Sequence, residues 1–279
     1  MVNKVVLTLA VFLVGCFAIP TPEWDQSIFY EHVDPEARIV GGSEAPEGAH
    51  PHMVALSNGV LIRSFVCGGS LISTRTVLTA AHCIAAVFSW GELSSSLRGT
   101  VGTNRWNQGG QSYAFARNVT HQNYVSSTIK NDIGILITST NVVLSPTVGI
   151  ISLTFNEVGG GIAARAAGWG RIRAGGALST LLLQLDVRTI SGQQCVDDVR
   201  QASIDFNVSA PPVEPHIELC VVHSVNHGMC NGDSGSALVR LDLGLQIGIV
   251  SWGFPCARGA PDMFVRVSAY QNWVLANAI

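Results

Sequence analysis

Three segments of the sequence hold the residue types that cleave an amide bond by nucleophilic attack. Ser234 lies in the glycine-rich segment 231–235, His82 follows an apolar run, and Asp132 precedes one. This chemistry needs a hydroxyl nucleophile, an imidazole that accepts its proton, and a carboxylate that orients the imidazole. Small neighbours would also let the backbone amides of Gly232 and Ser234 point at one position and stabilise an oxyanion. The residues therefore predict a serine hydrolase.

Each segment also has a purely structural interpretation. A Ser-Gly turn in a β protein is ordinarily only a turn, and a lone His is usually structural. Asp132 is harder to explain in this way, because a carboxylate that enters the apolar run 133–136 is costly to bury unless it accepts hydrogen bonds. An imidazole N–H is a suitable donor, so the prediction depends on the three segments together.

The elements that must position these residues are short β-strands. After residue 38, runs rich in Val, Ile and Leu alternate with clusters of Gly, Asn, Ser and Pro, which is typical of an all-β barrel or sandwich. We predict strands over residues 53–56, 69–72, 76–79, 133–136, 163–168, 181–187, 236–240 and 246–251. Only the C-terminal end departs from this pattern, where Ser268 and the apolar residues after it predict an N-capped terminal helix.

The N-terminus predicts export from the cell. Residues 1–18 contain one basic residue, an apolar run and small residues suited to cleavage, which together are typical of a signal peptide. The run is shorter than the roughly 20 apolar residues that a membrane helix needs. Residues 19–38 are acidic and contain proline, which indicates a flexible leader before the main domain. We therefore expect a secreted, extracellular protein that does not associate with a membrane.

The cysteines fit an oxidising compartment. Seven are present, and assigning Cys16 to the signal peptide leaves an even number in the main domain. Six cysteines allow fifteen pairings, and counting does not choose among them. An alternative is a zinc site, because the spacing of Cys220, His223, His227 and Cys230 would suit this metal. Secretion favours disulfides, so we expect no metal.

Together, the motifs resemble those of chymotrypsin-family serine proteases. The junction 38–42, the segments 79–83, 131–136 and 232–235, and the segment 251–253 occur in the family's order and approximate spacing. The match covers residues 39–279, which would form the serine protease domain. The resemblance implies two six-stranded antiparallel barrels, with a boundary near residues 145–160 and the active site between them. It also implies an endopeptidase that needs no cofactor and cleaves protein or peptide substrates through an acyl-enzyme.

The resemblance assigns a role to each residue of the chemical motifs. Ser234 would be the nucleophile, His82 the general base and then acid, and Asp132 the carboxylate that holds the imidazole tautomer. Gly232 and Ser234 would supply the amides of the oxyanion hole.

A second group of residues would bind substrate and brace the site. Ser251 matches a serine that hydrogen-bonds the catalytic aspartate, and Ser251, Trp252 and Gly253 would pair with the substrate backbone. The resemblance also implies three disulfides: Cys67–Cys83, Cys195–Cys220 and Cys230–Cys256.

The junction before residue 39 resembles a zymogen activation site. Residues 19–38 would then be an activation peptide, and cleavage after Arg38 would create an α-ammonium group on Ile39. In the family this group pairs with the aspartate before the nucleophile, here Asp233, and a buried ion pair there would shape the oxyanion hole. Arg38 implies that a trypsin-like protease is the activator.

Specificity depends on a pocket whose floor and wall depart from those of trypsin. Gly228 aligns with the floor position that carries a carboxylate in trypsins, which predicts a preference for aromatic or large aliphatic residues. Asp262 aligns with the second wall. If it projects inward, the pocket resembles that of brachyurin-type collagenolytic proteases, which accept apolar and basic residues; otherwise it is a solvated loop carboxylate. Ser236 and Ala237 replace the common Gly-Pro and add bulk beneath the catalytic turn.

The composition indicates the class of protein and the environment in which it works. The net charge is −3, which describes an ordinary globular protein with no nucleic-acid signature. Lys130 is the only lysine after Arg38, which favours an alkaline gut lumen, with compositional drift as the alternative. The pattern at Asn118 and Asn207 predicts glycosylation acceptors.

The short leader, single domain and scarce lysine resemble insect midgut chymotrypsin-like enzymes. We therefore expect a monomeric digestive protease that meets proteinaceous inhibitors. Two alternatives are an inactive homologue that binds a partner, and a regulatory protease with one target. All three members of the triad are present, which disfavours the first, and the short leader disfavours the second.

Overall fold

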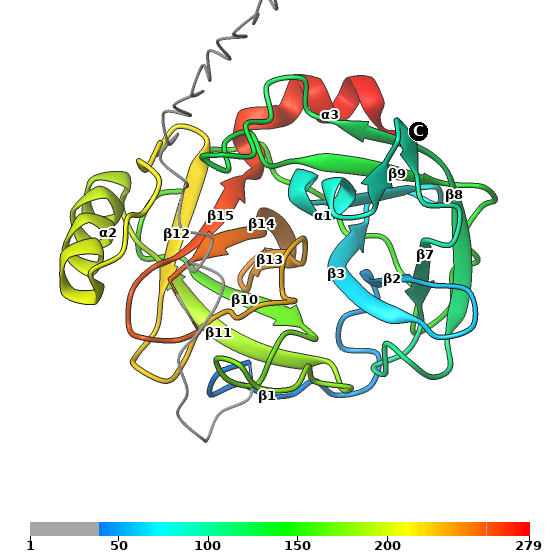
Figure 1. Ribbon diagram of the computed structural model, residues 1–279, viewed down its shortest axis with the longest axis horizontal. Coiled ribbons are helices and arrows are strands. Elements are labelled where there is room, and N and C mark those ends of the chain that lie inside the picture. Colours follow the sequence, from blue (N-terminus) through cyan, green and yellow to red (C-terminus); the bar gives the residue numbers. More distant parts are fainter. Residues whose placement is uncertain (1–38, 255) are drawn as a thin grey trace, which may run out of the picture.

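The computed structural model describes residues 39–254 and 256–279. Two β-barrels lie side by side, and few helices accompany them (Figure 1). The strands are β1 Ser43–Glu44, β2 Met53–Asn58, β3 Ser64–Leu71, β4 Thr76–Thr79, β5 Phe88–Ser89, β6 Glu92–Leu93, β7 Arg98–Val101, β8 Gln111–Thr120, β9 Gly134–Thr138, β10 Ala163–Gly168, β11 Leu183–Thr189, β12 Glu218–Val222, β13 Ala237–Arg240, β14 Leu245–Gly253 and β15 Asp262–Arg266. The helices are α1 Ala81–Ala85, α2 Gly192–Phe206, the 3-10 helix η2 Val267–Tyr270 and α3 Gln271–Asn277.

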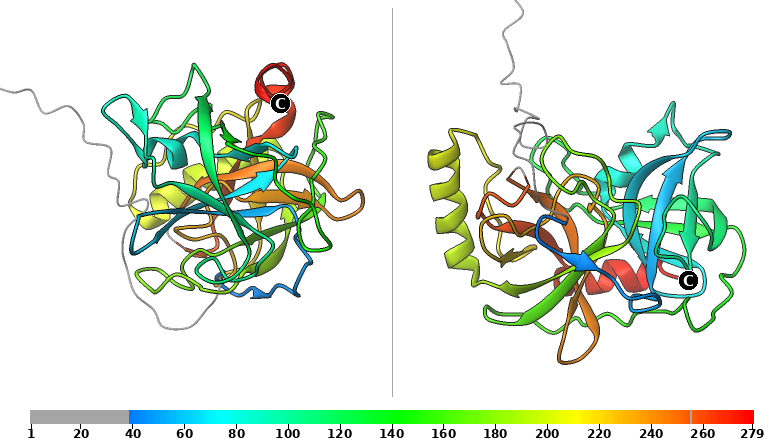
Figure 2. Two further views of the ribbon diagram at one scale, coloured as in Figure 1. Left: turned by 90° about the vertical axis from the view of Figure 1, so that its right-hand side faces the viewer. Right: turned by 90° about the horizontal axis from the view of Figure 1, so that it is seen from below.

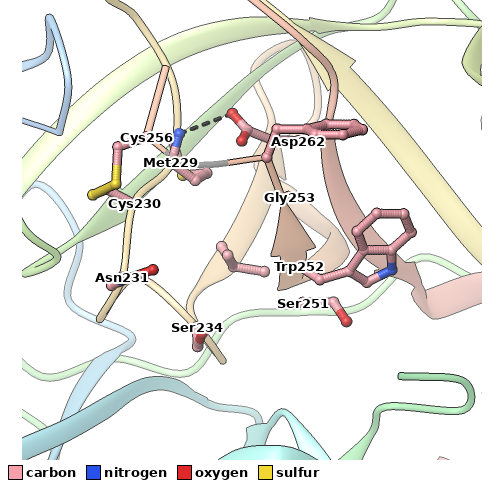
Figure 3. A pocket seen from close by; sticks show the side chains of 11 residues that line it. Met229, Cys230, Asn231, Ser234, Ser251, Trp252, Gly253, Cys256 and Asp262 are labelled. Carbon is pink, nitrogen blue, oxygen red and sulfur yellow. Dashed lines mark hydrogen bonds between the residues drawn. A yellow bond between two sulfur atoms is a disulfide. The ribbon is translucent and has the colours of Figure 1, made fainter. Parts of the chain in front are cut away.

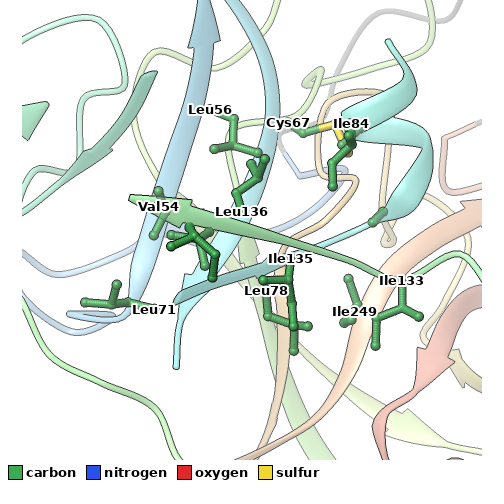
Figure 4. Packing of buried hydrophobic residues seen from close by; sticks show 14 of the residues in the cluster. Val54, Leu56, Cys67, Leu71, Leu78, Ile84, Ile133, Ile135, Leu136 and Ile249 are labelled. Atoms are coloured by element: carbon green, nitrogen blue, oxygen red, sulfur yellow. A yellow bond between two sulfur atoms is a disulfide. The ribbon is translucent and has the colours of Figure 1, made fainter. Parts of the chain in front are cut away.

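Six strands close the first barrel in the order β2-β3-β4-β9-β8-β7, and all their pairings are antiparallel. The apolar runs of β2, β4 and β9 fill its interior. Figure 4 shows Leu78 and Ile135 in this core together with Ile249 of β14, so the core continues toward the second barrel. The predicted strand at 76–79 is confirmed, the one at 53–56 extends to Asn58, and the one at 133–136 begins a residue later and ends at Thr138.

The second barrel follows the order β11-β10-β13-β14-β15-β12, and pairing of β11 with β12 closes it. The short strand β1 adds to the outer edge of β11. Alternating burial along β11 shows the period-two pattern expected when one face lies inward. The expected fold of two six-stranded antiparallel barrels is therefore confirmed.

The helices correct part of the sequence prediction. We expected no helix before the C-terminus, but α2 spans fifteen residues. Ser191 caps it by accepting the Gln194 amide, Asn207 ends it in a left-handed conformation, and Cys195 and Val199 face the core. The apolar face of α2 is narrow, because most of its residues are polar, so its helical periodicity is weak in the sequence.

The C-terminal helix is present but begins differently from the prediction. Ser268 lies inside η2 and does not cap α3, whose N-terminus at Tyr270 has no side-chain cap. Instead, Tyr270 and Val274 are buried in the core of the first barrel. The Ile279 backbone also bonds Thr76. The end of the chain therefore returns from the second barrel and packs against the first (Figures 1 and 2).

Three disulfides are present: Cys67–Cys83, Cys195–Cys220 and Cys230–Cys256. They are the pairs that the family resemblance implies. The proposed signal peptide and activation peptide, including Arg38, lie outside the described residues. In the part of the chain that the structure describes, no helix is long and apolar enough to cross a membrane.

Candidate active site

His82 and Asp132 meet at the edge of the first barrel. His82 lies in α1, directly after β4, and Asp132 lies two residues before β9. Because β4 and β9 pair side by side, the two residues that follow or precede them come together. His82 Nδ1 and Asp132 Oδ2 are 2.8 Å apart, and the His82 backbone amide donates to Oδ1 at 2.8 Å. The carboxylate therefore holds both the ring and the backbone of the histidine.

The environment of His82 favours a protonated ring. Burial alone would lower the imidazole pKa, but the charge of Asp132 and its hydrogen bond outweigh this and raise the pKa above its ordinary value. The side chain of His82 is still 27% exposed, whereas that of Asp132 is only 1% exposed. The ring can therefore exchange protons with a substrate on one side while the buried carboxylate orients it on the other.

The second barrel contributes a third hydrogen bond to Asp132. Ser251, near the end of β14, donates from Oγ to Asp132 Oδ2 at 2.6 Å. This bond joins the two barrels directly at the site. The buried carboxylate thus accepts three hydrogen bonds. These bonds offset the free-energy cost of burying a charge beside an apolar strand.

Ser234 lies in a turn that packs directly against the segment before His82. The Gly68 amide donates to the Ser234 carbonyl oxygen at 2.8 Å. Gly235 adopts a φ of +80°, and a Cβ there would lie 2.3 Å from Thr79 Oγ1. Only glycine fits so close to the end of β4, so the turn brings the serine to the strand that leads into α1.

The same turn shapes a pair of backbone donors. Gly232 has a φ of +103°, which favours glycine and turns its amide relative to its neighbours. Among the described residues, the amides of Gly232 and Ser234 have no hydrogen-bond acceptor in the chain. They remain available to an oxygen atom of a substrate.

The replacement of Gly-Pro by Ser236-Ala237 is accommodated. Ser236 is fully buried beneath the turn, and its Oγ would lie 2.0 Å from a Cβ on Gly68. The absence of a side chain at Gly68 therefore makes room for Ser236. The hydroxyl has no hydrogen-bond partner in the described structure.

A pocket extends from Ser234 and is lined by both walls that the Cys230–Cys256 disulfide joins (Figure 3). The lining residues are Met229, Cys230, Asn231, Ser234, Val250, Ser251, Trp252, Gly253, Phe254, Cys256 and Asp262. Figure 3 shows Ser234 and Asp262 at opposite ends of it. The walls are mostly apolar, and Asp262 is the one acidic residue among them.

Asp262 approaches the pocket floor from the first position of β15. Its Oδ2 accepts the Met229 amide at 2.8 Å and would lie 2.8 Å from a Cβ on Gly228. The carboxylate thus occupies space that a side chain at Gly228 would need. Burial raises the pKa of Asp262 to about 7; the Met229 hydrogen bond opposes this rise and the charge of Asp233 adds to it.

Asp233 and Ile39 are both fully buried in the second barrel. Asp233 accepts the Gly170 amide at 2.8 Å and the Cys230 amide at 3.0 Å. Burial raises its pKa to about 6 despite these two bonds. Val40, beside Ile39, accepts the Gly228 amide at 3.0 Å, so the start of the described chain also packs against the pocket.

The sequence interpretation missed a buried ion pair behind the pocket. Lys130 Nζ lies 2.7 Å from Glu218 Oε1, and both side chains are buried. The same oxygen accepts the Trp252 indole N–H at 2.8 Å. Through Glu218, the single lysine after Arg38 thus supports the indole of Trp252 in β14. Lys130 stands out in the sequence as an isolated lysine, but nothing local indicates its partner 88 positions away.

The zinc alternative is wrong, because Cys220 and Cys230 belong to separate disulfides. The rings of His223 and His227 stack on each other, with centroids 4.4 Å apart. Cys67, His82 and Cys83 have ligand atoms within 4.8 Å, but the two sulfurs form a disulfide and cannot bind as thiolates. Of the predicted acceptors, Asn118 lies in β8 and Asn207 ends α2.

Comparison with known proteins adds independent information. The profile of the family described as Trypsin matches residues 39–274. "Trypsin alpha-4" from Lucilia cuprina is 32% identical over 244 residues, covering 87% of this chain and 88% of that protein. "Chymotrypsin-2" from Vespa crabro is 32% identical over 242 residues, covering 86% and 100%. "Serine protease SP24D" from Anopheles gambiae is 34% identical over 242 residues, covering 85% and 80%.

Proposed function

We propose, from the premise that this chain belongs to the trypsin family of serine endopeptidases, that it is a secreted digestive enzyme made as a zymogen. Its preference would be broad and would lean toward apolar residues, with basic residues also accepted. The observation that carries the specificity is the Asp262 carboxylate beside Gly228 in a mostly apolar pocket.

In the proposed mechanism, Ser234 Oγ attacks the scissile carbonyl carbon while His82 Nε2 accepts the hydroxyl proton. The Gly232 and Ser234 amides stabilise the oxyanion, and removal of one such donor typically costs about a hundredfold to a thousandfold in turnover. His82 then protonates the leaving amine as the C–N bond breaks, which leaves the acyl group on Ser234 Oγ. In the second half, His82 accepts a proton from a water molecule that attacks the acyl carbon. It then returns the proton to Ser234 Oγ as the ester bond breaks and the acid product leaves. Asp132, held by Ser251, keeps the His82 tautomer that these transfers need.

The proposed specificity follows from the charge distribution in the pocket. An apolar side chain contacts the walls that Val250, Phe254 and Met229 provide. A longer basic side chain extends to Asp262, whose carboxylate receives one backbone hydrogen bond. Since Gly228 has no side chain, the floor offers no competing charge. We infer that Ser251, Trp252 and Gly253 pair with the substrate backbone above this pocket.

The proposed activation depends on Ile39 and Asp233. Cleavage after Arg38 by a trypsin-like protease would free the Ile39 ammonium, which would pair with the buried Asp233 carboxylate. Asp233 directly precedes Ser234 and is bonded to Gly170 and Cys230, so neutralising its charge stabilises the turn that presents the oxyanion donors. Residues 1–18 would act earlier, as a signal peptide.

The test is to express the precursor, activate it with immobilised trypsin, remove the trypsin, and assay matched peptide substrates that end in Phe, Leu or Arg. Ser234→Ala, carried through the same steps, is the control. Hydrolysis of all three that disappears in the control supports the proposal. A confirmed Ile39 terminus without hydrolysis would instead favour an inactive binding homologue, and cleavage of only one sequence in a protein digest would favour a regulatory protease.

A further inference from the structure

The turn between β2 and β3 exposes three consecutive aliphatic side chains. Val60, Leu61 and Ile62 are 83%, 96% and 85% exposed. Single exposed apolar residues are common on protein surfaces, but an uninterrupted run of three large ones is unusual without a binding role. The β2–β3 hairpin projects from the first barrel at the edge of the molecule (Figure 2, right).

Polar contacts hold this turn in a defined shape. Gly59 has a φ of +123°, and a Cβ there would lie 2.0 Å from the Ile62 carbonyl oxygen, so the turn closes tightly on glycine. Asn58 Oδ1 accepts the hydroxyls of Ser94 and Ser96 at 2.9 and 2.6 Å. The aliphatic side chains therefore point outward from a braced turn.

A fourth exposed apolar residue belongs to the neighbouring turn. Trp90 is fully exposed between β5 and β6, the hairpin that follows the helix of His82. Ser94 comes directly after β6 and bonds Asn58, so the bases of the two turns lie side by side. We call Val60, Leu61, Ile62 and Trp90 the apolar rim.

Strand β3 connects this rim to the catalytic serine. Gly68 of β3 donates to the Ser234 carbonyl oxygen, and the strand runs back from there to the turn. Among the described strands, β4 pairs with β3 only at Ser70 and Leu71, which leaves the edge from Ser64 to Cys67 without a strand partner on that side. Extended peptides bind such edges by adding a strand.

The length of this edge decides which substrate residues reach the rim. Ile62 lies six positions before Gly68, which spans about 20 Å at roughly 3.3 Å per residue. An extended polypeptide leaving the site along β3 would place about its fourth to sixth residue after the scissile bond against the aliphatic turn.

We propose that the apolar rim binds apolar side chains of a polypeptide substrate about four to six residues after the cleaved bond. This proposal rests on the proposed protease function and extends it to a second determinant of specificity. The occupant is an unfolded chain, because a continuous extended segment must span both Ser234 and the rim. Apolar segments of unfolded proteins become accessible in that state, so the rim favours them over folded surfaces.

The experiment uses the activated enzyme and three probes with identical residues before the scissile bond. Two are internally quenched peptides, one with Leu-Val-Leu and one with Ser-Thr-Ser at the fourth to sixth positions after it. The third is a p-nitroanilide, which has no residues beyond the bond. We expect the wild type to cleave the Leu-Val-Leu peptide with a kcat/KM about tenfold above that of the Ser-Thr-Ser peptide.

The variants are Leu61→Ser/Ile62→Ser and Trp90→Ser, with Leu275→Ser as a control because Leu275 is also exposed but lies on α3. The rim variants should lose the preference and keep wild-type anilide hydrolysis, whereas the control should keep both. An inactive wild type on the anilide would refute the protease function itself.

Equal cleavage of the two peptides by the wild type would overturn the rim proposal and requires no variant. A preference that survives in both rim variants would overturn it as well. Sedimentation distinguishes another occupant: a wild-type dimer that becomes a monomer in the rim variants, with unchanged peptide preference, would assign the rim to self-association.

Discussion

Asp262 should make the choice between basic and apolar substrates depend on pH. Its pKa is raised to about 7, so the pocket carboxyl is neutral in mild acid and ionised in mild alkali. A neutral carboxyl accommodates an apolar side chain, whereas an arginine needs the charge. The ratio of kcat/KM for an Arg substrate to that for a Leu substrate should therefore rise with pH.

The size of the change follows from the titration. At pH 5.5 a group with a pKa near 7 is about 3% ionised, and at pH 8.5 about 97%, so the ratio should rise about 30-fold between them. That factor corresponds to about 2 kcal/mol of differential transition-state binding. Because kcat/KM reports ionisations of the free enzyme, the bound arginine does not shift the midpoint.

The assay measures kcat/KM for two peptide anilides that differ only in Arg or Leu before the bond, at closely spaced pH values. His82 and Asp233 also titrate, but they affect both substrates and cancel in the ratio. Asp262→Asn keeps the shape of the group without its ionisation and serves as the control. Its ratio should stay low and flat.

Two results would refute this reasoning. If the wild-type ratio does not change with pH, the carboxylate does not contact the substrate side chain. If Asp262→Asn retains the pH-dependent rise, another group is responsible for it.

Three further predictions concern the groups around the site. Ser251→Ala removes one of the three hydrogen bonds to Asp132 and should lower kcat about tenfold with little change in KM; a larger effect on KM would indicate a role in binding. Lys130→Met leaves the Glu218 charge buried without its cation and should lower the free energy of unfolding by about 3–5 kcal/mol in urea titrations. Adding Glu218→Leu should restore most of the lost stability. A Lys130→Met variant with unchanged stability would contradict the importance of the buried pair. If the Ile39 ammonium pairs with Asp233, the pKa of the ammonium rises above its ordinary value near 8. The active conformation is then fully stabilised below pH 8, and activity falls as pH rises through the raised pKa. An active enzyme with an acetylated Ile39 terminus would exclude the pair.

The alkaline-lumen hypothesis and the proposed activation mechanism favour opposite ranges of working pH. Scarcity of lysine favours an alkaline setting, while the Ile39–Asp233 pair would weaken there. The structure gives Lys130 a specific reason to remain, because the buried Glu218 needs a cation at that position. The pH dependence of activity around the raised pKa of the Ile39 ammonium would also measure how far the Ile39–Asp233 pair limits alkaline activity.

Local sequence determined much of the site, because the candidate catalytic residues occur in short motifs whose neighbours are themselves informative. Ser234 lies between Gly232 and Gly235, which both adopt a positive φ, and Asp132 adjoins an apolar strand that makes its burial costly. The strands near these motifs were predicted to within a few residues, because a barrel strand is an apolar run between turn residues. The helix α2 was missed, since its apolar face is narrow and polar residues surround it.

Only the tertiary structure decided the features that join residues far apart in the chain. The inward position of Asp262 depends on how β15 packs against the Met229 segment, and the Lys130–Glu218 pair joins the two barrels. The location of the apolar rim likewise depends on bonds between two turns. Local sequence specifies backbone shape and residue type, whereas the distance between two side chains depends on packing of the whole fold, which no local pattern encodes.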